Sequence, residues 1–528
     1  MKSIFISIVL ISSILPLSMS NHHKKDEWKS RSIYKLLTDR FSKDDNTETT
    51  CADLSKYCGG TFNGIKKNLD YIVGMGFDAI WISPPLKNKE GSFHGYHNID
   101  INSINEHFGT AEELKDLIKA CHDKDIWVIL DAVPNHMAGE LDISTFIPFN
   151  KEEYYHMNMP GLKCDQWDDN NQTIVENCPI WGMPDLAQEN EFVKEKLLSW
   201  LKTMIDDYGF DGVRYADVRN VPKWFWGNFT KVADTYTLGI VSSENADYIS
   251  DYQNYMDGVG DYPLYYAMRK SFSGESMTLL KDYYEQTHPK YLKPEYNGIW
   301  FSNHDNPRFL NSTENVDSFK NAIIFTLFYE GIPIFYYGDE QLYKGGNDPN
   351  NREVLFGNYK TDSEIYQMVK IANKVRKENK IYDKELRQVY ADNDFYVFTR
   401  GDVLIAVSNG KSNELTITDH GYKNGDKLCN QLDEKDCVAV VGPEFKFEID
   451  KKPKIYVKVN PKDSGNNFIK FSFVYLMLAF SAKKSMCGII CENVTQKIRR
   501  EGIQNEKNHG LYYRYAFRYT NGMRNCER

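Results

Sequence analysis

The alternation of short apolar runs with helical segments constrains the fold of this chain more than any other feature. Proline or polar residues bound these runs, and segments of helical character separate several of them. Strands and helices that alternate at this spacing are typical of parallel sheets with crossover helices. We therefore predict an α/β fold in which eight such units close into a (β/α)8 barrel. The expected strands include residues 78–84, 126–131, 238–243, 299–302 and 332–336, and the expected helices include 111–121 and 191–207.

The alternation breaks in two places. Residues 135–184 form a long loop-rich stretch that contains Cys164 and Cys178. Long loops without regular structure inside a compact domain are usually functional. From about residue 384 to 460 the pattern changes to short alternating strands, which predicts an all-β C-terminal domain. Residues 461–528 fit neither pattern. They include a ten-residue stretch, 471–480, that is apolar except for Ser472 and is too short for a membrane-spanning helix.

The N-terminus and the composition bear on location and partners. Residues 1–20 combine a basic start, an apolar centre and small residues at the end, which predicts a secretory signal peptide. Export makes disulfides available to the ten cysteines. It also makes the sequons at Asn171, Asn228, Asn311 and Asn493 candidates for glycosylation. The net charge of −10 argues against a nucleic-acid partner, which requires a basic surface.

One segment carries charge at the end of a predicted strand. Phe210 to Asn220 reads Phe-Asp-Gly-Val-Arg-Tyr-Ala-Asp-Val-Arg-Asn, an apolar start followed by charged residues. A buried parallel strand delivers such residues to the mouth of an α/β barrel. This segment is therefore the first candidate for part of a functional site.

The segment resembles the α-amylase family of retaining glycoside hydrolases, most closely its secreted fungal-type members. Asp211, Gly212 and Arg214 match the family pattern without a gap, but Ala216 stands where the family has its nucleophilic Asp. The resemblance implies a barrel over residues 30–134 and 185–383, an inserted calcium-binding subdomain at 135–184 after strand 3, and a β-sandwich at 384–460. It also implies a Cys51–Cys58 disulfide. For Cys429 two partners stay open, either Cys437 or a cysteine nearer the C-terminus.

The resemblance assigns two further catalytic carboxylates. Glu244, in Ser242-Ser243-Glu244-Asn245, matches the general acid/base, and Asp305, in Asn303-His304-Asp305-Asn306, matches the transition-state-stabilising carboxylate. Asp217 is an alternative nucleophile. Side chains on a strand alternate faces, so Asp217 is expected to point away from the place of its neighbour unless a bulge re-aims it.

Other matched residues are expected to hold the sugar or a calcium ion. Asp131 would support the site by pairing with Arg214. The expected substrate-binding residues are Tyr96, His136, Arg214, Arg219, His304, Asp348 and Arg352. Hard oxygen ligands from separate loops suit Ca²⁺. The expected calcium ligands are the side chains of Asn135, Glu176 and Asp185 and the carbonyl oxygen of Asn220.

Three functional hypotheses follow. The first is a protein that recognises α-1,4-glucans, starch or glycogen, with weak or absent hydrolysis because of Ala216. The second is an active secreted α-amylase that uses Asp217 as its nucleophile. The third is a non-catalytic barrel that binds protein partners. In each case we expect a monomer without a stable membrane span, located outside the cell or in the lumen of the secretory or endolysosomal pathway.

Overall fold

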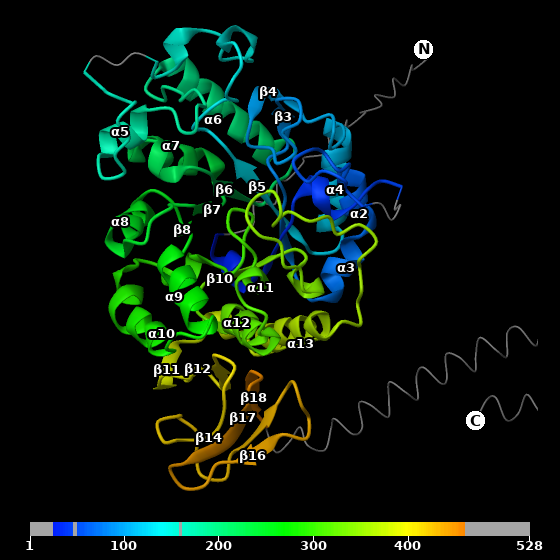
Figure 1. Cartoon of the computed structure of the whole chain (residues 1–528), viewed down its shortest axis with the longest axis vertical. Coiled ribbons are helices and arrows are strands. Elements are labelled where there is room, and N and C mark those ends of the chain that lie inside the picture. Colours follow the sequence, from blue (N-terminus) through cyan, green and yellow to red (C-terminus); the bar gives the residue numbers. More distant parts are fainter. Residues whose placement is uncertain (1–24, 46–49, 158–160, 460–528) are drawn as a thin grey trace, which may run out of the picture. The chain divides into compact units, whose positions relative to one another are not determined.

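The computed structural model describes residues 25–45, 50–157 and 161–459 (Figure 1). The predicted signal peptide, the tail at 461–528 and the sequon at Asn493 lie outside the described residues. No helix within the described ranges is long and apolar enough to cross a membrane.

The main body is a parallel barrel, as predicted. Across the described residues its sheet has eight strands in the order β8-β7-β6-β5-β2-β1-β10-β9. A parallel bridge between Gly260 and Gly298 nearly closes the gap between the two end strands. These strands are β1 (Ile33–Lys35), β2 (Ala79–Trp81), β5 (Trp127–Ala132), β6 (Gly212–Tyr215), β7 (Tyr236–Gly239), β8 (Gly258–Val259), β9 (Gly298–Ile299) and β10 (Ile332–Tyr336).

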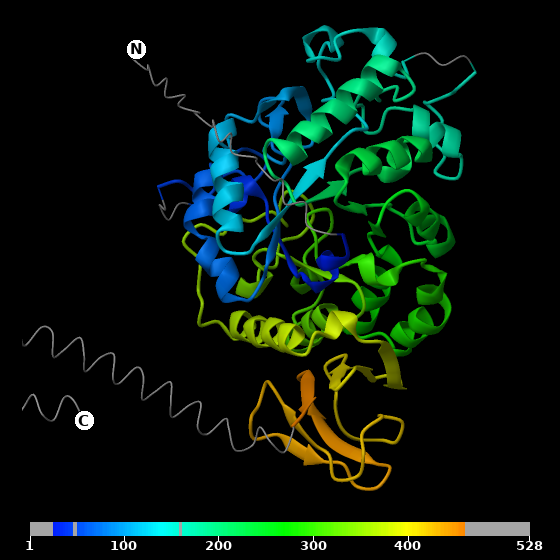
Figure 2. The ribbon, with the colours of Figure 1, turned by 180° about the vertical axis from the view of Figure 1, so that it is seen from behind.

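Helices connect the barrel strands and cover the outside of the sheet (Figures 1 and 2). Helix α4 starts at a capping box, in which the Thr110 side chain accepts from the Glu113 N–H and the Glu113 carboxylate accepts from the Thr110 N–H. The helices are α1 (Thr38–Phe41), α2 (Phe62–Lys67), α3 (Leu69–Gly74), α4 (Ala111–His122), α5 (Gln172–Asn177), α6 (Glu191–Asp206), α7 (Lys223–Ala233), α8 (Ala246–Ser250), α9 (Tyr262–Phe272), α10 (Thr278–Asp282), α11 (Phe309–Ser312), α12 (Val316–Phe328) and α13 (Glu364–Glu378).

Trp28 packs against the start of the barrel strands. It lies in a short 3-10 helix, η1 (Lys25–Ser30), and is fully buried. Its ring lies 5.1 Å from Trp127 and 5.2 Å from Tyr236, and its Nε1 donates to the Asp211 carbonyl oxygen at 3.1 Å. A Cβ at Gly212 would lie 2.7 Å from the Trp28 ring, which explains the glycine in the Asp-Gly pair.

The inserted segment after the third barrel strand contains little regular structure, as predicted. It holds α5, short 3-10 turns and a disulfide between Cys164 and Cys178. Figure 2 shows it, in cyan, beside α6 and α7. A small antiparallel hairpin, β3 (Leu86–Asn88) and β4 (Asn98–Ile104), precedes it in the chain.

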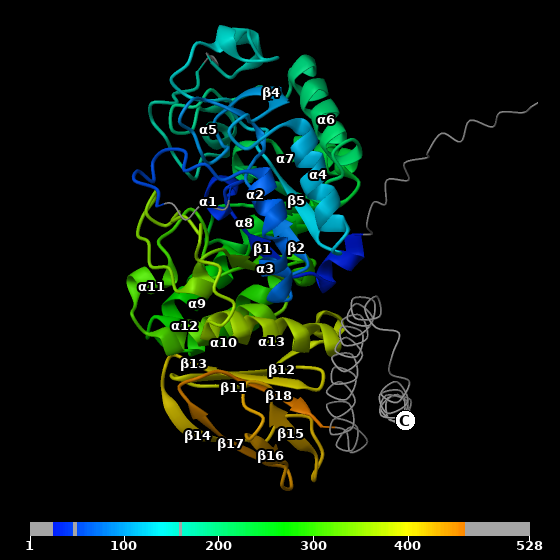
Figure 3. The same cartoon turned by 90° about the vertical axis from the view of Figure 1, so that its right-hand side faces the viewer.

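The C-terminal domain is antiparallel, also as predicted. One sheet has the order β11-β12-β13-β18-β15-β16, and β14 pairs with β17. Figure 3 shows α12 and α13 against β11, β12 and β13, and the Asn321 side chain of α12 accepts from the Ser408 N–H at 2.9 Å. The strands are β11 (Leu386–Ala391), β12 (Phe395–Arg400), β13 (Val403–Ser408), β14 (Ser412–Ile417), β15 (Lys427–Asn430), β16 (Cys437–Ala439), β17 (Phe445–Asp450) and β18 (Lys454–Lys458).

Two disulfide questions left by the sequence are answered. Cys51 bonds to Cys58, as the resemblance implied. Cys429 bonds to Cys437, its neighbour across β15 and β16, and not to a cysteine nearer the C-terminus.

Two barrel strands are shorter than the sequence suggested. The run expected over 238–243 is β7, which ends at Gly239, and the run expected over 299–302 is β9, which ends at Ile299. The paired residues of β7 and β9 end there, and past Gly239 the Ile240 N–H still donates to the Tyr215 carbonyl oxygen at 3.1 Å before the chain becomes loop. Glu244 and Asp305 therefore come from loops at the C-terminal ends of these strands, where barrel enzymes place their sites.

Candidate active site at the C-terminal ends of the barrel strands

The centre of the candidate site is a buried ion pair between neighbouring strands. Asp131 on β5 and Arg214 on β6 stand opposite each other in register. Arg214 Nη1 donates to Asp131 Oδ1 at 2.7 Å. The other carboxylate oxygen accepts from Trp81 Nε1 at 2.9 Å and from the Tyr96 hydroxyl at 2.7 Å. The predicted pairing of Asp131 with Arg214 is thus present, and it holds the guanidinium at the barrel mouth.

Tyr96 links this pair to His304 and Asp305. The Tyr96 and His304 rings stack at 5.6 Å with an angle of 2° between their planes, and the Tyr96 hydroxyl lies 3.0 Å from His304 Nε2. The same imidazole nitrogen lies 3.3 Å from Asp305 Oδ1. Burial holds the pKa of His304 well below its usual range, so the ring is neutral at pH 7.

Asp305 faces the open space of the site. Its side chain is 46% exposed. The protein around the carboxyl group removes part of its water, and this desolvation raises the pKa of Asp305, whereas the positive charges of Arg214, Arg352 and Lys35 oppose the rise. Arg352 Nε donates to the His304 carbonyl oxygen at 3.1 Å. Its guanidinium also pairs with the Asp348 carboxylate at 3.2 Å. Asp348 and Arg352, both expected substrate-binding residues, thus lie together beside His304.

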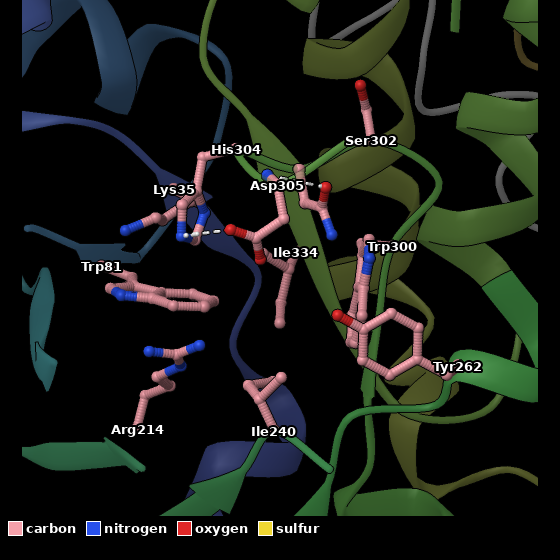
Figure 4. Close-up of a pocket in the computed structure, with 11 residues that line it drawn as sticks. Lys35, Trp81, Arg214, Ile240, Tyr262, Trp300, Ser302, His304, Asp305 and Ile334 are labelled. Atoms are coloured by element: carbon pink, nitrogen blue, oxygen red, sulfur yellow. Dashed lines mark hydrogen bonds and ion pairs between the residues drawn. The ribbon is translucent and has the colours of Figure 1, made fainter. Parts of the chain in front are cut away.

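A small cavity lies beneath Asp305. Its volume is about 20 Å³, room for one water molecule. Figure 4 shows Trp81, Arg214, Tyr262 and Asp305 around this space, with the Tyr262 hydroxyl pointing into it. Most of the lining is aromatic or aliphatic.

Ala216 follows β6 directly and is buried, with 2% of its surface exposed. Its N–H donates to the Ala132 carbonyl oxygen at 2.9 Å, so the backbone continues the strand pairing up to this point. A methyl group therefore stands at the position where the resemblance led us to expect a carboxylate.

Asp217 does not continue the strand. Its backbone is left-handed, with φ 49° and ψ 41°, at the start of the 3-10 helix η4 (Val218–Asn220). We expected Asp217 to point away from the place of the Ala216 side chain because side chains alternate along an extended strand. The backbone of Asp217 is not extended, so this rule does not apply to it. The Asp217 carboxylate is 22% exposed and lies 3.7 Å from Nδ1 of the buried His136. The structure thus brings Asp217 together with one predicted sugar-binding residue.

Glu244 lies in the loop between β7 and α8. It is exposed, and it makes no hydrogen bond or ion pair with another described residue. Arg219 lies close to this loop, because its Nη1 donates to the Ser242 carbonyl oxygen at 3.2 Å. Its Nη2 donates to the carbonyl oxygen of Asp169 in the insert at 2.9 Å and pairs with that carboxylate at 3.1 Å. Arg219 therefore joins the insert to the loop that carries Glu244.

Comparison with known proteins identifies the family. Residues 35–393 match the family described as alpha amylase, catalytic domain. The chain belongs to this family.

Individual relatives agree with that assignment. The chain is 36% identical over 447 residues to Alpha-amylase 1 of Schwanniomyces occidentalis, a match that covers 77% of this chain and 86% of that protein. It is also 36% identical over 432 residues to a Beta/alpha-amylase of Paenibacillus polymyxa, covering 77% of this chain but only 36% of that longer protein. The solved structure of an α-amylase from Malbranchea cinnamomea has a TM-score of 0.79 at 31% identity, covering 83% of this chain and 98% of that one.

Three of the four expected calcium ligands meet in this member of the α-amylase family. As placed, the Asn135 side-chain oxygen faces Asp185 Oδ1 at 3.1 Å and the Asn220 carbonyl oxygen at 2.9 Å. Three oxygen atoms this close together need a donor or a cation between them. A rotated Asn135 amide would donate its N–H₂ group to Asp185 and Asn220, and a bound cation would instead be shared by all three oxygens. The donor set fits Ca²⁺, which prefers oxygen ligands of mixed type. No group of three or more His, Cys, Asp or Glu side chains that could hold a metal ion occurs in the described ranges, and two of these three ligands are an amide and a carbonyl.

Glu176 stands slightly apart from the other three residues. Its Oε1 accepts from Gln172 Nε2 at 2.7 Å within α5. The preceding residue, Val175, accepts from Asn220 Nδ2 through its carbonyl oxygen at 3.0 Å. Burial raises the pKa of Glu176. Glu176 is thus next in sequence to a residue that contacts Asn220, but its own carboxylate accepts from Gln172 and contacts none of the other three expected calcium ligands in the described structure.

Sequence reasoning missed Lys35, at the end of β1. The lysine is buried, and its Nζ makes no hydrogen bond to any described residue. The ammonium lies 3.8 Å from Asp131 Oδ2 and 4.2 Å from the centre of the Trp81 ring. Burial lowers the pKa of Lys35 to about 7, and Asp131 opposes that shift. The available signal was a single basic residue inside the otherwise apolar run Ile33-Tyr34-Lys35-Leu36-Leu37.

Proposed function

We propose that this protein recognises α-1,4-glucans, starch or glycogen, in a calcium-supported cleft and hydrolyses them weakly or not at all. One observation carries the proposal. Arg214, Tyr96, His304 and Asp305 are assembled as a sugar-binding site would require, yet the residue at the end of β6 is Ala216. The chain thus keeps the groups that would hold a sugar and lacks the group that would attack it.

The chemistry explains why a single missing carboxylate matters. A retaining glycosidase needs an acid/base and a nucleophile about 5–5.5 Å apart, on opposite sides of the bond that breaks. Here Glu244 would protonate the leaving oxygen and Asp305 would stabilise the positive charge that develops on the sugar. A methyl group cannot form the covalent intermediate, and removing a nucleophile costs about 10⁶ in rate in a well-studied hydrolase.

A second candidate function is hydrolysis through Asp217. The left-handed backbone at this residue frees its carboxylate from the alternation of β6 and directs it toward His136, itself an expected sugar-binding residue. This conformation is costly for a non-glycine residue, by about 1–2 kcal/mol, although Asp tolerates it better than most. Strain of this kind is concentrated at functional sites.

Calcium would support the cleft rather than take part in bond breaking. Asn135, Asp185 and the carbonyl oxygen of Asn220 would hold the ion, with Glu176 nearby. Asn135 directly precedes His136, and Asn220 follows Arg219. A bound ion would therefore fix two loops that carry expected sugar-binding residues.

We also propose that the protein is exported and works as a monomer. Three disulfides among the described residues and the predicted signal peptide favour an oxidising compartment. The sequon residues Asn171, Asn228 and Asn311 are all exposed, as glycan attachment requires.

The test is release of reducing ends from soluble starch, with calcium present, by the full chain and by Ala216→Asp and Asp217→Ala variants. We expect the parent to be nearly inert, Ala216→Asp to gain activity, and all three proteins to bind maltotriose. An active parent whose activity is lost in Asp217→Ala would refute the proposal and identify Asp217 as the nucleophile. Failure of the parent to bind maltotriose would refute the recognition of glucans itself.

A further inference from the structure

Two adjacent barrel strands are followed by apolar residues at the mouth of the barrel. The strands are β6 and β7, which pair in parallel with Tyr215 opposite Gly239. The next residues are Ala216 on β6 and Ile240 on β7. The Ile240 N–H donates to the Tyr215 carbonyl oxygen at 3.1 Å, so the pairing continues to this point. Ala216 and Ile240 are therefore neighbours in register, on strands that lie about 4.8 Å apart.

Both side chains point into the barrel. Tyr215 faces outward, because its ring stacks on the ring of Trp226 in α7 at 4.7 Å. Side chains alternate along a strand, so the next residue, Ala216, faces inward. Ile240 faces inward as well, since it lines the small cavity beneath Asp305 (Figure 4). The two apolar side chains thus stand side by side on the inner face of the barrel.

This arrangement has the spacing of a retaining catalytic pair. A retaining glycosidase needs a nucleophile and a proton donor whose carboxyl groups lie about 5–5.5 Å apart. Carboxyl groups at in-register positions of neighbouring strands, about 4.8 Å apart, would meet that requirement. Catalytic residues of barrel enzymes also come from the C-terminal ends of several strands. The places of Ala216 and Ile240 therefore suit the two catalytic carboxyl groups, but both hold hydrocarbon side chains.

The surroundings of Ile240 would suit a proton donor. Its surface is 7% exposed, and Tyr262, Trp300 and Ile334 line the cavity together with it. An apolar environment raises the pKa of a carboxyl group and keeps it protonated near neutral pH, as a general acid must be. Glutamate is similar in size to isoleucine, and the adjacent cavity leaves room for its carboxyl group.

Glu244 lies in a different environment. It follows Ile240 by four residues and is exposed in the loop between β7 and α8. Its nearest recorded electrostatic influence is on Tyr266 of α9, which is only partly buried. A catalytic group must be held in a defined position against the bond that breaks. Among the described residues nothing holds the Glu244 carboxylate in such a position, whereas the backbone of Ile240 is fixed by its bond to β6.

We propose that Ala216 and Ile240 occupy the two places of the retaining pair, so that this chain lacks its proton donor as well as its nucleophile and holds glucans without cutting them. The inference rests on the proposed function for its ligand, and it moves the place of the proton donor from Glu244 to Ile240. Arg214 and Asp305 are retained, which is the pattern of a sugar-binding site that has lost its bond-breaking groups.

Restoring both positions defines the test. In the full chain carrying Ala216→Asp and Ile240→Glu, the introduced aspartate would attack C1 of the sugar while the bond from C1 to the leaving oxygen breaks. The introduced glutamate would give that oxygen its proton and later take a proton from the water that releases the sugar. α-Maltosyl fluoride with azide requires only the nucleophile, because fluoride leaves without a proton and azide attacks the glycosyl-enzyme without a base.

We expect the double variant Ala216→Asp/Ile240→Glu to release reducing ends from soluble starch, with calcium, about 10²–10⁴-fold faster than Ala216→Asp alone, the usual contribution of general acid–base catalysis. The matched control is Ala216→Asp/Ile240→Gln, which has nearly the same size and polarity but no acidic proton, and it should not show this gain. With α-maltosyl fluoride and azide, Ala216→Asp should be active and Ile240→Glu alone should be inactive.

Starch hydrolysis by Ala216→Asp at the rate of the double variant would overturn the inference, and the proposed function would stand with a donor elsewhere. A folded double variant that binds maltotriose but cleaves neither substrate would also overturn the inference. If Ile240→Glu does not fold, Ala216→Asp still decides, because similar rates on starch and on the fluoride would contradict a missing donor. Failure of the parent to bind maltotriose in a calorimetric titration would instead refute the proposed function.

Discussion

Replacing Lys35 by methionine should stabilise the protein, and more so at acidic pH. In the folded chain this lysine is buried at the end of β1, and its ammonium has no hydrogen-bond partner among the residues that the structure describes. Burial lowers the pKa of Lys35 from 10.5 to about 7. One pKa unit is worth about 1.36 kcal/mol, so keeping this side chain charged in the folded state costs about 5 kcal/mol. Methionine has a similar length, fills the same space and carries no charge.

The sign of the pH dependence follows from proton binding. Between pH 7 and 10.5 the unfolded chain keeps the Lys35 proton and the folded chain has lost it, so the unfolded state binds more protons. Stability from this group therefore rises with pH across that window and is constant below it. The advantage of Lys35→Met should be about 5 kcal/mol at pH 6, fall to about 2 kcal/mol at pH 9 and disappear near pH 10.5.

Urea unfolding of the parent and of Lys35→Met at pH 6, 7.5 and 9 tests this reasoning. Other titrating groups are common to both proteins and cancel in the difference. Lys374→Met is the control, because Lys374 is 69% exposed on α13 and should show no pH-dependent difference. Asp131 keeps three donors in the variant, from Arg214, Trp81 and Tyr96. A Lys35→Met protein that is less stable than the parent at pH 6 would refute the argument and mean that the contact with Asp131 outweighs the desolvation of Lys35.

Three further predictions concern the metal, the barrel core and the site. Chelation of calcium should lower the melting temperature of the parent in differential scanning calorimetry. If calcium is present at a hundred times its dissociation constant, the loss in unfolding free energy is about 3 kcal/mol. The Asp185→Asn variant should show a much smaller decrease. Trp28→Ala should cost about 3–5 kcal/mol in urea unfolding, because it empties a fully buried site. Tyr96→Phe keeps the ring but removes the hydroxyl that contacts Asp131 and His304, so maltotriose should bind about tenfold more weakly, and an unchanged titration would refute that role.

The parts of the fold that depend on periodicity could be predicted from the sequence. The apolar runs that became β2, β5 and β10 needed only their composition and boundaries, because a strand buried on both faces must be apolar almost throughout. The pairing of Asp131 with Arg214 was also predictable, since each residue occupies a matched motif. The ends of β7 and β9 were not, because apolar residues continue past the last residue of each strand.

The features that decide function at this site depend on conformation and contact, which sequence patterns express poorly. Asp217 was expected to face away because a strand was assumed, and a single left-handed residue removes that constraint. Lys35 shows no motif, and its importance arises only when β1 places it beside Asp131 and Trp81. Ala216 is the opposite case, because the sequence alone locates the missing carboxylate. What the structure adds is that the methyl group of Ala216 is buried and that the carboxylate of the next residue, Asp217, is directed to His136. Ala216→Asp restores a carboxylate at this position and leaves Arg214, His304 and Asp305 unchanged in the sequence, so a gain of activity in that variant is the most direct measure of how complete the rest of the site is.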